Sequence, residues 1–283
     1  MTQLEATFSE LSEGDVLLLE PGGNFGDHLI YMGLEKALDG LGVDYSAIRR
    51  RSIPQGIASY PKLLAARLPV GREYSAVYIH GGSNFNEEWG WGIHLFRIAH
   101  RLFDCPIIVG PQSCPPDGTD LESTFAKADN DITFFCREEY SYDILTDIEQ
   151  NLGNLTVDLS QDTALYLDRS DFEGLDWGER HTVAAFRQDW ESSGTSHDIP
   201  ENIDIESDLS IEADSLHDFA NTVAGAKKVY TDRLHVGLMA AILEKPAVLY
   251  DNVYYKNRGV YEFSLEEDDN IEFVYTRDEP IAQ

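Results

Sequence analysis

The chain has 283 residues, 42% hydrophobic and 11% aromatic, which is the composition of a folded protein with room for about two domains. Its 51 acidic residues outnumber 21 basic ones, giving a formal charge of −30, so the chain repels phosphates and general nucleic-acid binding is excluded. No apolar run approaches the ~18 residues of an integral membrane segment, and three cysteines without a CxxC pair exclude a disulfide framework and a thiolate zinc site.

In the first half, apolar runs alternate with amphipathic stretches, which predicts a parallel sheet with helices on both faces. In Asp27–Leu41 apolar residues recur close to every 3.6 positions, as in a helix. The predicted strands are Val16–Leu19, Ala76–His80, Pro106–Val109, Ile132–Cys136 and Leu155–Val157. Further helices are expected near Tyr60–Arg67, Ile93–Phe103, Asp120–Ala128 and Glu138–Ile148.

The pattern weakens at Tyr166–Arg180, which is polar and aperiodic and is expected to be a linker. A second, smaller α/β unit follows, with a long polar loop expected at Glu191–Ser210. Its predicted elements are His181–Phe186, Ser215–Ala224, Lys228–Tyr230, Asp232–Leu243, Ala247–Tyr250 and Ile271–Tyr275. The predicted domains are therefore residues 1–168 and 181–283, with ligands bound in a cleft beyond the carboxyl ends of the strands.

The loop Pro21–His28 (PGGNFGDH) follows the first strand and allows two interpretations. Glycines such as Gly23 permit close ligand approach, and Asp27 can cap the next helix, whose free N–H groups suit an anion or a hydroxyl. The same residues also suit a tight strand–helix turn. The loop fits neither a dinucleotide fingerprint nor a Walker loop, because Pro21 occupies the first glycine position and no GK[ST] follows.

Three more loops follow strands of the first half: His80–Glu87 (HGGSNFNE), Gly110–Ser113 (GPQS) and Cys136–Glu138 (CRE). In a doubly wound sheet all these loops lie on one edge, so together they predict a site. Their candidate ligand-binding residues are Gly82, Ser83, Asn84, Gln112, Ser113 and Arg137.

In the second half, Arg187 directly follows an apolar strand, and Thr231–Pro246 (TDRLHVGLMAAILEKP) begins a helix capped by Thr231 or Asp232. Arg233 and His235 then lie in the first turn, where a cation is unfavourable by ~0.3–1 kcal/mol unless an anion binds there. Two explanations stay open: an anionic ligand, or pairing of Arg233 with a surface carboxylate.

Together, GGNFGD, HGGSNF, GPQS, CRE and TDRLHVGLMAAILEKP resemble the polysaccharide pyruvyl transferase family over about Val16 to Tyr261. The C-terminal Asp251–Glu262 (DNVYYKNRGVYE) is also similar. One departure is Ser83, where the family commonly has a third glycine. The resemblance implies two Rossmann-like domains facing a cleft, as in glycosyltransferase B, and transfer of pyruvate from phosphoenolpyruvate to a sugar as a ketal, with phosphate released. It implies no nucleotide cofactor and no metal.

By motif, the resemblance implies that Arg233 and His235 belong to the donor site, with Arg187 a less direct match. Asn24 and Asp27 match the glycine loop on the acceptor side, and the first domain is expected to bind the acceptor. Arginine forks suit the carboxylate and phosphate of phosphoenolpyruvate. His235 is the expected general acid or phosphate ligand, Asp27 a base or hydroxyl ligand, and Gly23 and Asp232 further binding residues.

Two other functions stay open: a glycosyltransferase that uses a nucleotide sugar, and a non-catalytic relative that binds a sugar or an anion. The expected partners are phosphoenolpyruvate and a sugar or lipid-linked glycan. The absence of a signal sequence and the sparse cysteines predict a cytoplasmic protein, at the inner membrane face when the acceptor is lipid-linked. The acidic excess predicts a halophilic organism, because molar salt shortens the Debye length to about 3 Å and screens self-repulsion.

Overall fold

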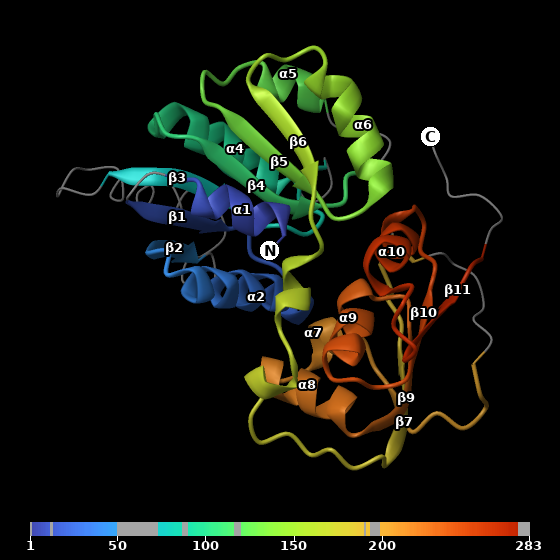
Figure 1. Ribbon diagram of the computed structural model, residues 1–283. Helices are drawn as coiled ribbons and strands as arrows, with labels where there is room; N and C mark the ends of the chain where they lie inside the picture. Colours follow the sequence, from blue (N-terminus) through green and yellow to red (C-terminus); the bar gives the residue numbers. More distant parts are fainter. Residues whose placement is uncertain are drawn as a thin grey trace. The chain divides into compact units, whose positions relative to one another are not determined.

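The computed structural model describes residues 2–11, 14–49, 73–86, 90–115, 120–189, 191–192 and 199–276. Its internal contacts divide the chain into two compact units (Figure 1). The first unit comprises Met1–Gly22 and Leu34–Thr163, and the second comprises Gly23–Gly33 and Ala164–Gln283. The predicted boundary near residue 168 thus lies close to the division at Thr163, but the glycine loop groups with the second unit instead of the first.

The first unit is built on a six-stranded sheet in the order β2-β1-β3-β4-β5-β6, in which every pairing is parallel. Four strands carry continuous buried apolar runs, as expected for a sheet covered on both faces. The strands are β1 (Asp15–Glu20), β2 (Tyr45–Arg49), β3 (Tyr74–Ile79), β4 (Ile107–Gln112), β5 (Ile132–Cys136) and β6 (Leu155–Leu159). All five predicted strands are present, and β2 is an unpredicted edge strand that is only half-buried.

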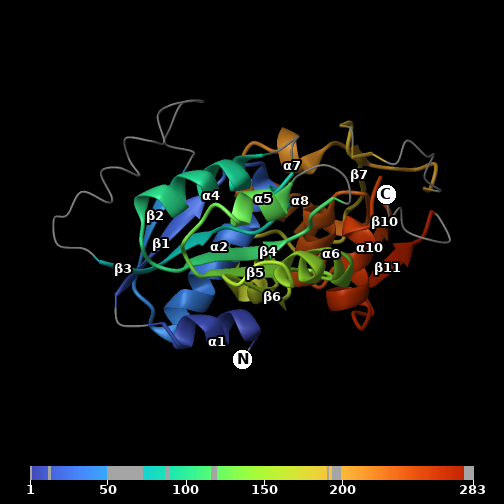
Figure 2. The ribbon, with the colours of Figure 1, turned by 90° about the horizontal axis from the view of Figure 1, so that it is seen from above.

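Helices of the first unit pack against this sheet, with α4 in contact with β3 and β4 (Figure 2). The helices are α1 (Gln3–Ser9), α2 (Phe25–Leu41), α4 (Trp91–Leu102), α5 (Leu121–Phe125) and α6 (Glu139–Glu149). A cluster of aromatic rings fills the core between α4, α5 and the sheet, where Phe134 meets Phe85 edge-to-face at 5.2 Å. The helix predicted near Tyr60–Arg67 lies outside the described residues.

The second unit has a five-stranded parallel sheet in the order β11-β10-β9-β7-β8. Its strands are β7 (His181–Ala185), β8 (Ile205–Glu206), β9 (Ala226–Thr231), β10 (Ala247–Tyr250) and β11 (Ile271–Val274). Its helices are α7 (Leu209–Glu212), α8 (Leu216–Ala224), α9 (Leu234–Ile242), α10 (Lys256–Val260) and the π-helical η4 (Tyr261–Leu265). The prediction of two α/β units with parallel sheets is confirmed.

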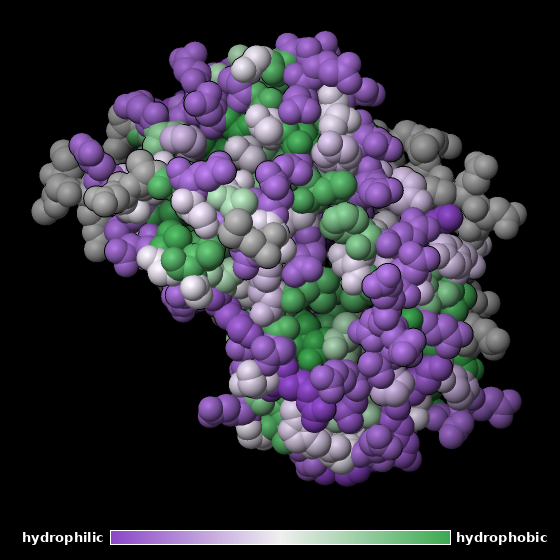
Figure 3. Space-filling model, in the orientation of Figure 1, coloured by the Kyte–Doolittle hydropathy of each residue, from purple (hydrophilic) through white to green (hydrophobic). Residues whose placement is uncertain are grey.

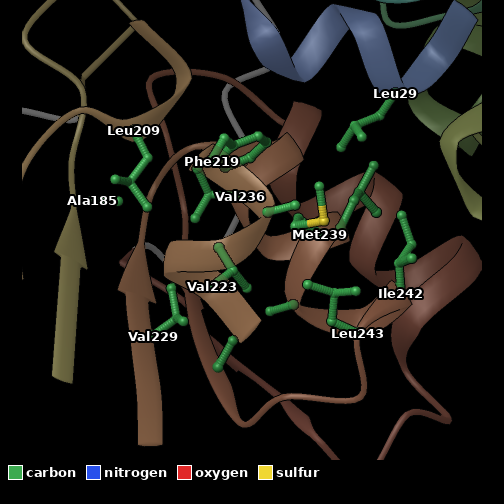
Figure 4. Packing of buried hydrophobic residues seen from close by; sticks show 14 of the residues in the cluster. Leu29, Ala185, Leu209, Phe219, Val223, Val229, Val236, Met239, Ile242 and Leu243 are labelled. Carbon is green, nitrogen blue, oxygen red and sulfur yellow. The ribbon is translucent and has the colours of Figure 1, made fainter. Parts of the chain in front are cut away.

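The core of the second unit lies around α9, which is apolar on all sides because it is buried by α8, β9 and β10 (Figure 4). Two segments outside the sheet contribute to this core. Leu29, from the first turns of α2, is fully buried in it, and so are Leu167 and Leu175 of the predicted linker, at 6% and 8% exposure. The expected linker instead forms two short 3-10 turns, η2 (Thr163–Tyr166) and η3 (Arg169–Asp171).

The long loop predicted at Glu191–Ser210 is wrong in its last part, because Ile205–Glu206 pairs with β7 as the edge strand β8. In the part of the chain that the structure describes, no helix has both the length and the apolar character needed to cross a bilayer.

Candidate functional site

Two arginines follow the carboxyl ends of neighbouring strands in the second-unit sheet. Arg187 follows β7 and Arg233 follows β9, and these parallel neighbours end in register, with Ala185 opposite Thr231. The Thr231 hydroxyl donates to the carbonyl of Ala185 at 2.6 Å and accepts from the N–H of Arg233 at 2.9 Å. The two strand ends are therefore fixed to each other directly beneath the arginines.

Arg187 is held by acidic residues of its own loop. Its Nε and Nη2 donate to Oδ1 and Oδ2 of Asp189 at 2.7 and 3.0 Å, and its Nη1 pairs with Glu191. Its backbone N–H donates to Asp232 at 2.8 Å. The Arg187 side chain is only 7% exposed, so these carboxylates replace most of its water.

Arg233 is held by the carboxylate of Asp208, which follows β8, and shares the carboxylate of Asp189 with Arg187. Its Nε donates to Oδ1 of Asp208 at 2.9 Å and its Nη2 to Oδ2, a bidentate pair in which both side chains are 6% exposed. Its Nη1 lies 3.1 Å from Oδ2 of Asp189. Pairing with a carboxylate was one of the two expected explanations, but the main partner is buried instead of lying on the surface.

The ion pairs set the protonation of these carboxylates. Burial raises the pKa of Asp189, but the hydrogen bond from Arg187 and the charges of Arg187 and Arg233 outweigh it and hold this pKa below its usual value. Burial likewise raises the pKa of Glu191, and Lys256 and Arg187 reverse the shift. At Asp232 burial prevails and raises the pKa to about 6, against the N–H and charge of Arg187.

A third cation and two amides come from the segment after β10. Lys256 Nζ pairs with the buried Glu191, and Val253 N–H donates to the carbonyl of Glu191 at 3.2 Å. Asn257 Nδ2 donates to the carbonyls of Asp232 and Tyr250, at 2.7 and 2.9 Å. Asn252 is 2% exposed, and neither atom of its side-chain amide has a hydrogen-bond partner among the described residues. A buried amide without a hydrogen-bond partner lowers the stability of the fold, and a ligand that bonds to it would offset this cost.

His235 lies half-buried in the first turn of α9, directly against the glycine loop. A Cβ added to Gly26 would lie 2.5 Å from the Cβ of His235 and 2.9 Å from its Nδ1, so only glycine fits here without displacing the histidine. Thr231 or Asp232 was the predicted cap of α9; the N-cap residue is Arg233, and Thr231 accepts from its N–H. The predicted cap position is therefore wrong by one or two residues.

Asn24 and Asp27 organise the start of α2. The Asn24 N–H donates to Oδ2 of Asp27 at 2.8 Å, and Oδ1 of Asn24 accepts from the N–H of Gly26 at 2.8 Å. Gly23 has φ = 146°, and a Cβ there would lie 1.9 Å from the Asp27 carboxylate. The helix begins two residues earlier than predicted, at Phe25, so Asp27 lies within its first turn, and the side chain that accepts from an N–H of that turn is Asn24 instead of Asp27.

The other predicted binding residues lie together at the carboxyl edge of the first-unit sheet. Gly82 N–H donates to the carbonyl of Pro111, and Ser113 N–H donates back to the carbonyl of Gly82, both at 2.9 Å. Gln112 is fully buried, donating to the carbonyl of His80 and accepting from the N–H of Asn84.

Ser83 donates to the carbonyl of Ser113 at 3.1 Å. Ser83 and Asn84 are the half-buried members of this group. They are therefore its members with side chains that reach solvent.

Arg137 lies at the end of β5 in the same unit and is 1% exposed. Its Nη1 lies 2.7 Å from Oδ2 of the buried Asp162, and its Nε donates to the hydroxyl of Ser113 at 2.9 Å. The neighbouring Glu138 is fully buried and accepts from the N–H of Ser141, and burial raises its pKa to about 7. These hydrogen bonds and the ion pair form a buried polar network at the ends of β4, β5 and β6.

The structure therefore brings the predicted residues into two groups. One group lies in the second unit and includes the glycine loop: Gly23, Asn24, Asp27, Arg187, Asp232, Arg233 and His235. The other lies in the first unit: Gly82, Ser83, Asn84, Gln112, Ser113 and Arg137.

Sequence reasoning did not identify the side chains that complete the first of these groups, which are Asp189, Glu191, Asp208, Asn252 and Lys256. The sequence held a signal for Lys256, since it is one of only 7 lysines in the chain and follows a predicted strand closely. Within the described ranges, no set of three or more His, Cys, Asp or Glu side chains is arranged to hold a metal ion.

Comparison with known proteins gives one family match. The family model described as polysaccharide pyruvyl transferase matches residues 24–252. The chain is also similar to Pyruvyl transferase 1 of Schizosaccharomyces pombe, with 25% identity over 260 residues, in an alignment that takes in 81% of this chain and 63% of that protein. The chain thus spans less than two thirds of the length of this curated relative.

Among solved structures, a functionally uncharacterised protein from Klebsiella pneumoniae shares the fold, with a TM-score of 0.69, 22% identity, and coverage of 96% of this chain and 95% of that one. Escherichia coli heptosyltransferase WaaC with ADP gives a TM-score of 0.43 at 14% identity, covering 93% of each chain.

Proposed function

Because this chain belongs to the polysaccharide pyruvyl transferase family, we propose that it transfers a pyruvyl group from phosphoenolpyruvate to a sugar of a glycan, forming a ketal and releasing phosphate. The observation that carries the donor assignment is the convergence of Arg187 and Arg233 on one oxygen, Oδ2 of Asp189, at 3.0 and 3.1 Å. Two guanidinium groups repel each other at this separation unless an anion lies between them. A site that holds them together is suited to an anionic ligand.

The donor carries two anionic groups, and the second unit offers cations for both. The planar forks of Arg187 and Arg233 match a carboxylate or a phosphate, and Lys256 adds a compact charge. The amide of Asn252 supplies a hydrogen-bonding group that has no partner among the described residues. In a chain with 51 acidic and 21 basic residues, such a concentration of cations at one sheet edge supports a specific anion site.

The reaction joins two sugar hydroxyls to C2 of phosphoenolpyruvate. The methylene carbon gains a proton and becomes a methyl group, the first sugar oxygen bonds to C2, and the second sugar oxygen then replaces the phosphate. Each hydroxyl loses its proton: one of these protons balances the proton that the methylene carbon gains, and the other leaves on the phosphate, which departs with the electron pair of the broken C–O bond. His235 lies in the first turn of α9, two residues after Arg233. It is proposed as the acid that protonates the methylene carbon or stabilises the departing phosphate.

Asp27 is proposed as the group that accepts a proton from a sugar hydroxyl or orients it. Its Oδ2 accepts from the N–H of Asn24, a contact that holds the carboxylate at the start of α2. Ser83 and Asn84, half-buried at the edge of the first-unit sheet, are proposed to bind the acceptor glycan by hydrogen bonds.

The donor assignment is tested by calorimetry with phosphoenolpyruvate at molar KCl, where self-repulsion is screened. Arg233→Ala removes one of the two guanidinium groups and is expected to weaken binding by about 100-fold or more, since the ligand loses its charge-assisted bond to this residue. Arg233→Lys keeps the charge that Asp208 needs and is expected to weaken binding as well, because an ammonium cannot hold Asp208 bidentately and still present a separate N–H edge to the ligand. Arg169→Ala is the control: Arg169 is a surface arginine of the same unit, 46% exposed, paired with Glu244.

Saturable binding that both Arg233 variants reduce supports the proposal. A folded wild-type protein that binds a nucleotide sugar and not phosphoenolpyruvate would instead identify the alternative, a nucleotide-sugar glycosyltransferase. Adding candidate glycans to the same cell checks whether the acceptor must bind first.

A further inference from the structure

We propose that Asp189 determines the specificity of the donor site: its carboxylate occupies the position, between Arg187 and Arg233, that the carboxylate of the donor takes when it binds. This inference rests on the proposed function and identifies the protein group that occupies the carboxylate position of the donor site before the donor binds. Oδ1 of Asp189 accepts from Arg187 Nε and from the N–H of Glu191, at 2.7 and 3.2 Å. Oδ2 accepts from Arg187 Nη2 at 3.0 Å and lies 3.1 Å from Arg233 Nη1. A planar group with two oxygens therefore fits between the two arginines.

The charges of the cluster require that a carboxylate leaves when a ligand enters. Arg187, Arg233 and Lys256 are paired directly with Asp189, Glu191 and Asp208, so their formal charges cancel. Adding a donor with two anionic groups to this closed set would bring uncompensated charge into a site whose cations are 6–7% exposed. That is costly in a region with little water.

Asp189 is the partner best placed to leave. Its side chain is 27% exposed, against 2% for Glu191 and 6% for Asp208. Glu191 also binds Lys256, and Asp208 holds the Nε and Nη2 edge of Arg233, so both anchor the cations from the buried side. When Asp189 turns away, Arg187 Nε and Nη2 and Arg233 Nη1 become free together, while the buried carboxylates keep both guanidinium groups in position.

The inference predicts that removing the charge of Asp189 without changing the size of its side chain strengthens donor binding. Asp189→Asn keeps the size of the side chain and weakens its hold on the arginines, so the open state becomes more populated. The apparent affinity of a ligand rises by the same factor as the fraction of binding-competent protein. We expect phosphoenolpyruvate to bind about tenfold more tightly to Asp189→Asn than to the wild type.

The experiment measures Kd by calorimetry at molar KCl for two probes, phosphoenolpyruvate and methyl phosphate, which has the phosphate but no carboxylate. A gain for phosphoenolpyruvate with less than about a twofold change for methyl phosphate supports the overlap of the two carboxylates. Equal gains for both probes would reduce Asp189 to a general negative charge and overturn the inference. Weaker phosphoenolpyruvate binding would also overturn it, and would make Asp189 a positioning residue for Arg187.

Asp176→Asn is the matched control, because Asp176 is an acid of the same unit, 54% exposed, that pairs with Arg180 away from the cluster. It is expected to leave both affinities unchanged. The outcomes also separate this inference from the proposed function. Binding of phosphoenolpyruvate that Arg233→Ala abolishes but Asp189→Asn does not improve rejects the inference alone. Absence of such binding in the folded wild type and in Asp189→Asn, with or without glycans, rejects both.

Discussion

Gly26 and His235 are in contact at a point where a single methyl group would not fit, and this contact fixes the orientation of the histidine. In Gly26→Ala the added Cβ would lie 2.5 Å from the Cβ of His235, a distance that forces the histidine or the loop to move. A displacement of about 1 Å at a reacting group costs on the order of 100-fold in rate, so we expect kcat to fall by about that factor with a smaller change in phosphoenolpyruvate affinity. Steady-state kinetics together with calorimetry measure both quantities.

Gly40→Ala is the control for that variant, because Gly40 lies on the same helix with nothing within 4 Å of an added Cβ. It is expected to leave kcat unchanged and to stabilise the protein slightly, since alanine favours helix over glycine. If both variants kept full activity, the contact with Gly26 would have no role in orienting His235.

Glu138 makes the stability of the first unit depend on pH in the direction opposite to an ordinary carboxylate. Burial raises its pKa to about 7 from 4.5, so the folded chain binds a proton that the unfolded chain has lost. Between these values its contribution is full at the lower pH and is lost as the pH rises, by up to about 3 kcal/mol. Glu138→Gln should remove this loss, so the free energy of unfolding of the variant gains on the wild type as the pH rises from 4.5 to 7.

Denaturant unfolding across that pH range, at constant high salt, measures the difference. Glu139→Gln changes an exposed acid in the next position and is expected to follow the wild-type profile. Parallel profiles for Glu138→Gln and the wild type would show that folding does not raise the pKa of Glu138.

Sequence reasoning could place Arg187 and Arg233 at a sheet edge, because Arg187 directly follows an apolar strand, Arg233 starts the helix that follows another strand, and the carboxyl ends of parallel strands share one edge. It could not find their partners. With 51 acidic residues in the chain, nothing local distinguishes Asp189 or Asp208 from the carboxylates that merely face water. Which acid pairs with which arginine is decided by tertiary packing, and so is the burial of Arg137 against Asp162.

At the scale of elements, the strands with the plainest sequence signal are those buried on both faces. Runs such as VLLL in β1 and IIV in β4 are apolar without interruption, because helices cover both faces of the sheet. The edge strands β2 and β8 escape this signal, since half of their surface faces solvent and β8 has only 2 residues. Missing β8 also conceals Asp208, which follows it.

Helix α2 contributes Leu29 to the core of the second unit, although its place in the sequence is within the predicted first domain. Leu29 is fully buried and belongs to the same hydrophobic cluster as Met239 and other residues of the second unit (Figure 4). Leu29→Ala leaves a cavity there and should lower the free energy of unfolding by about 2–5 kcal/mol. Leu41→Ala, at the half-buried end of the same helix, should cost less.

Hydrogen exchange identifies the unit that Leu29→Ala affects. We expect amides of β9 and α9 to lose protection, while those of β4 and β5 keep it. Loss of protection confined to the first-unit strands would contradict the assignment of Leu29 to the second core.

On the scale of the whole molecule, charge dominates the surface. Hydrophilic side chains cover most of the face seen in Figure 3, and the formal charge of the chain is −30. The Debye length falls from about 10 Å at 0.1 M salt to about 3 Å at 1 M, so repulsion between surface carboxylates is screened over this range. We therefore expect Tm to rise with KCl, with most of the gain below about 1 M.

Thermal unfolding followed by circular dichroism from low to molar KCl measures that gain. Sucrose in place of the salt is the control, because it favours the compact state without screening charge. A Tm that does not change with KCl, or that falls, would contradict the halophilic origin proposed from the composition. Ion pairs buried in the donor site are screened much less than those at the surface, so molar KCl and anion binding are compatible.

The division of α2 between the two units also orders events during synthesis of the chain. Leu29 leaves the ribosome about 200 residues before Leu234 and the rest of α9, the helix it packs against. At about 5–20 residues per second, the apolar face at the start of α2 waits on the order of 10 to 40 s for its partner. During that interval it must stay in water or be covered by a chaperone, so the first turns of α2 expose an apolar surface on the nascent chain for longer than a segment that packs against its sequence neighbours.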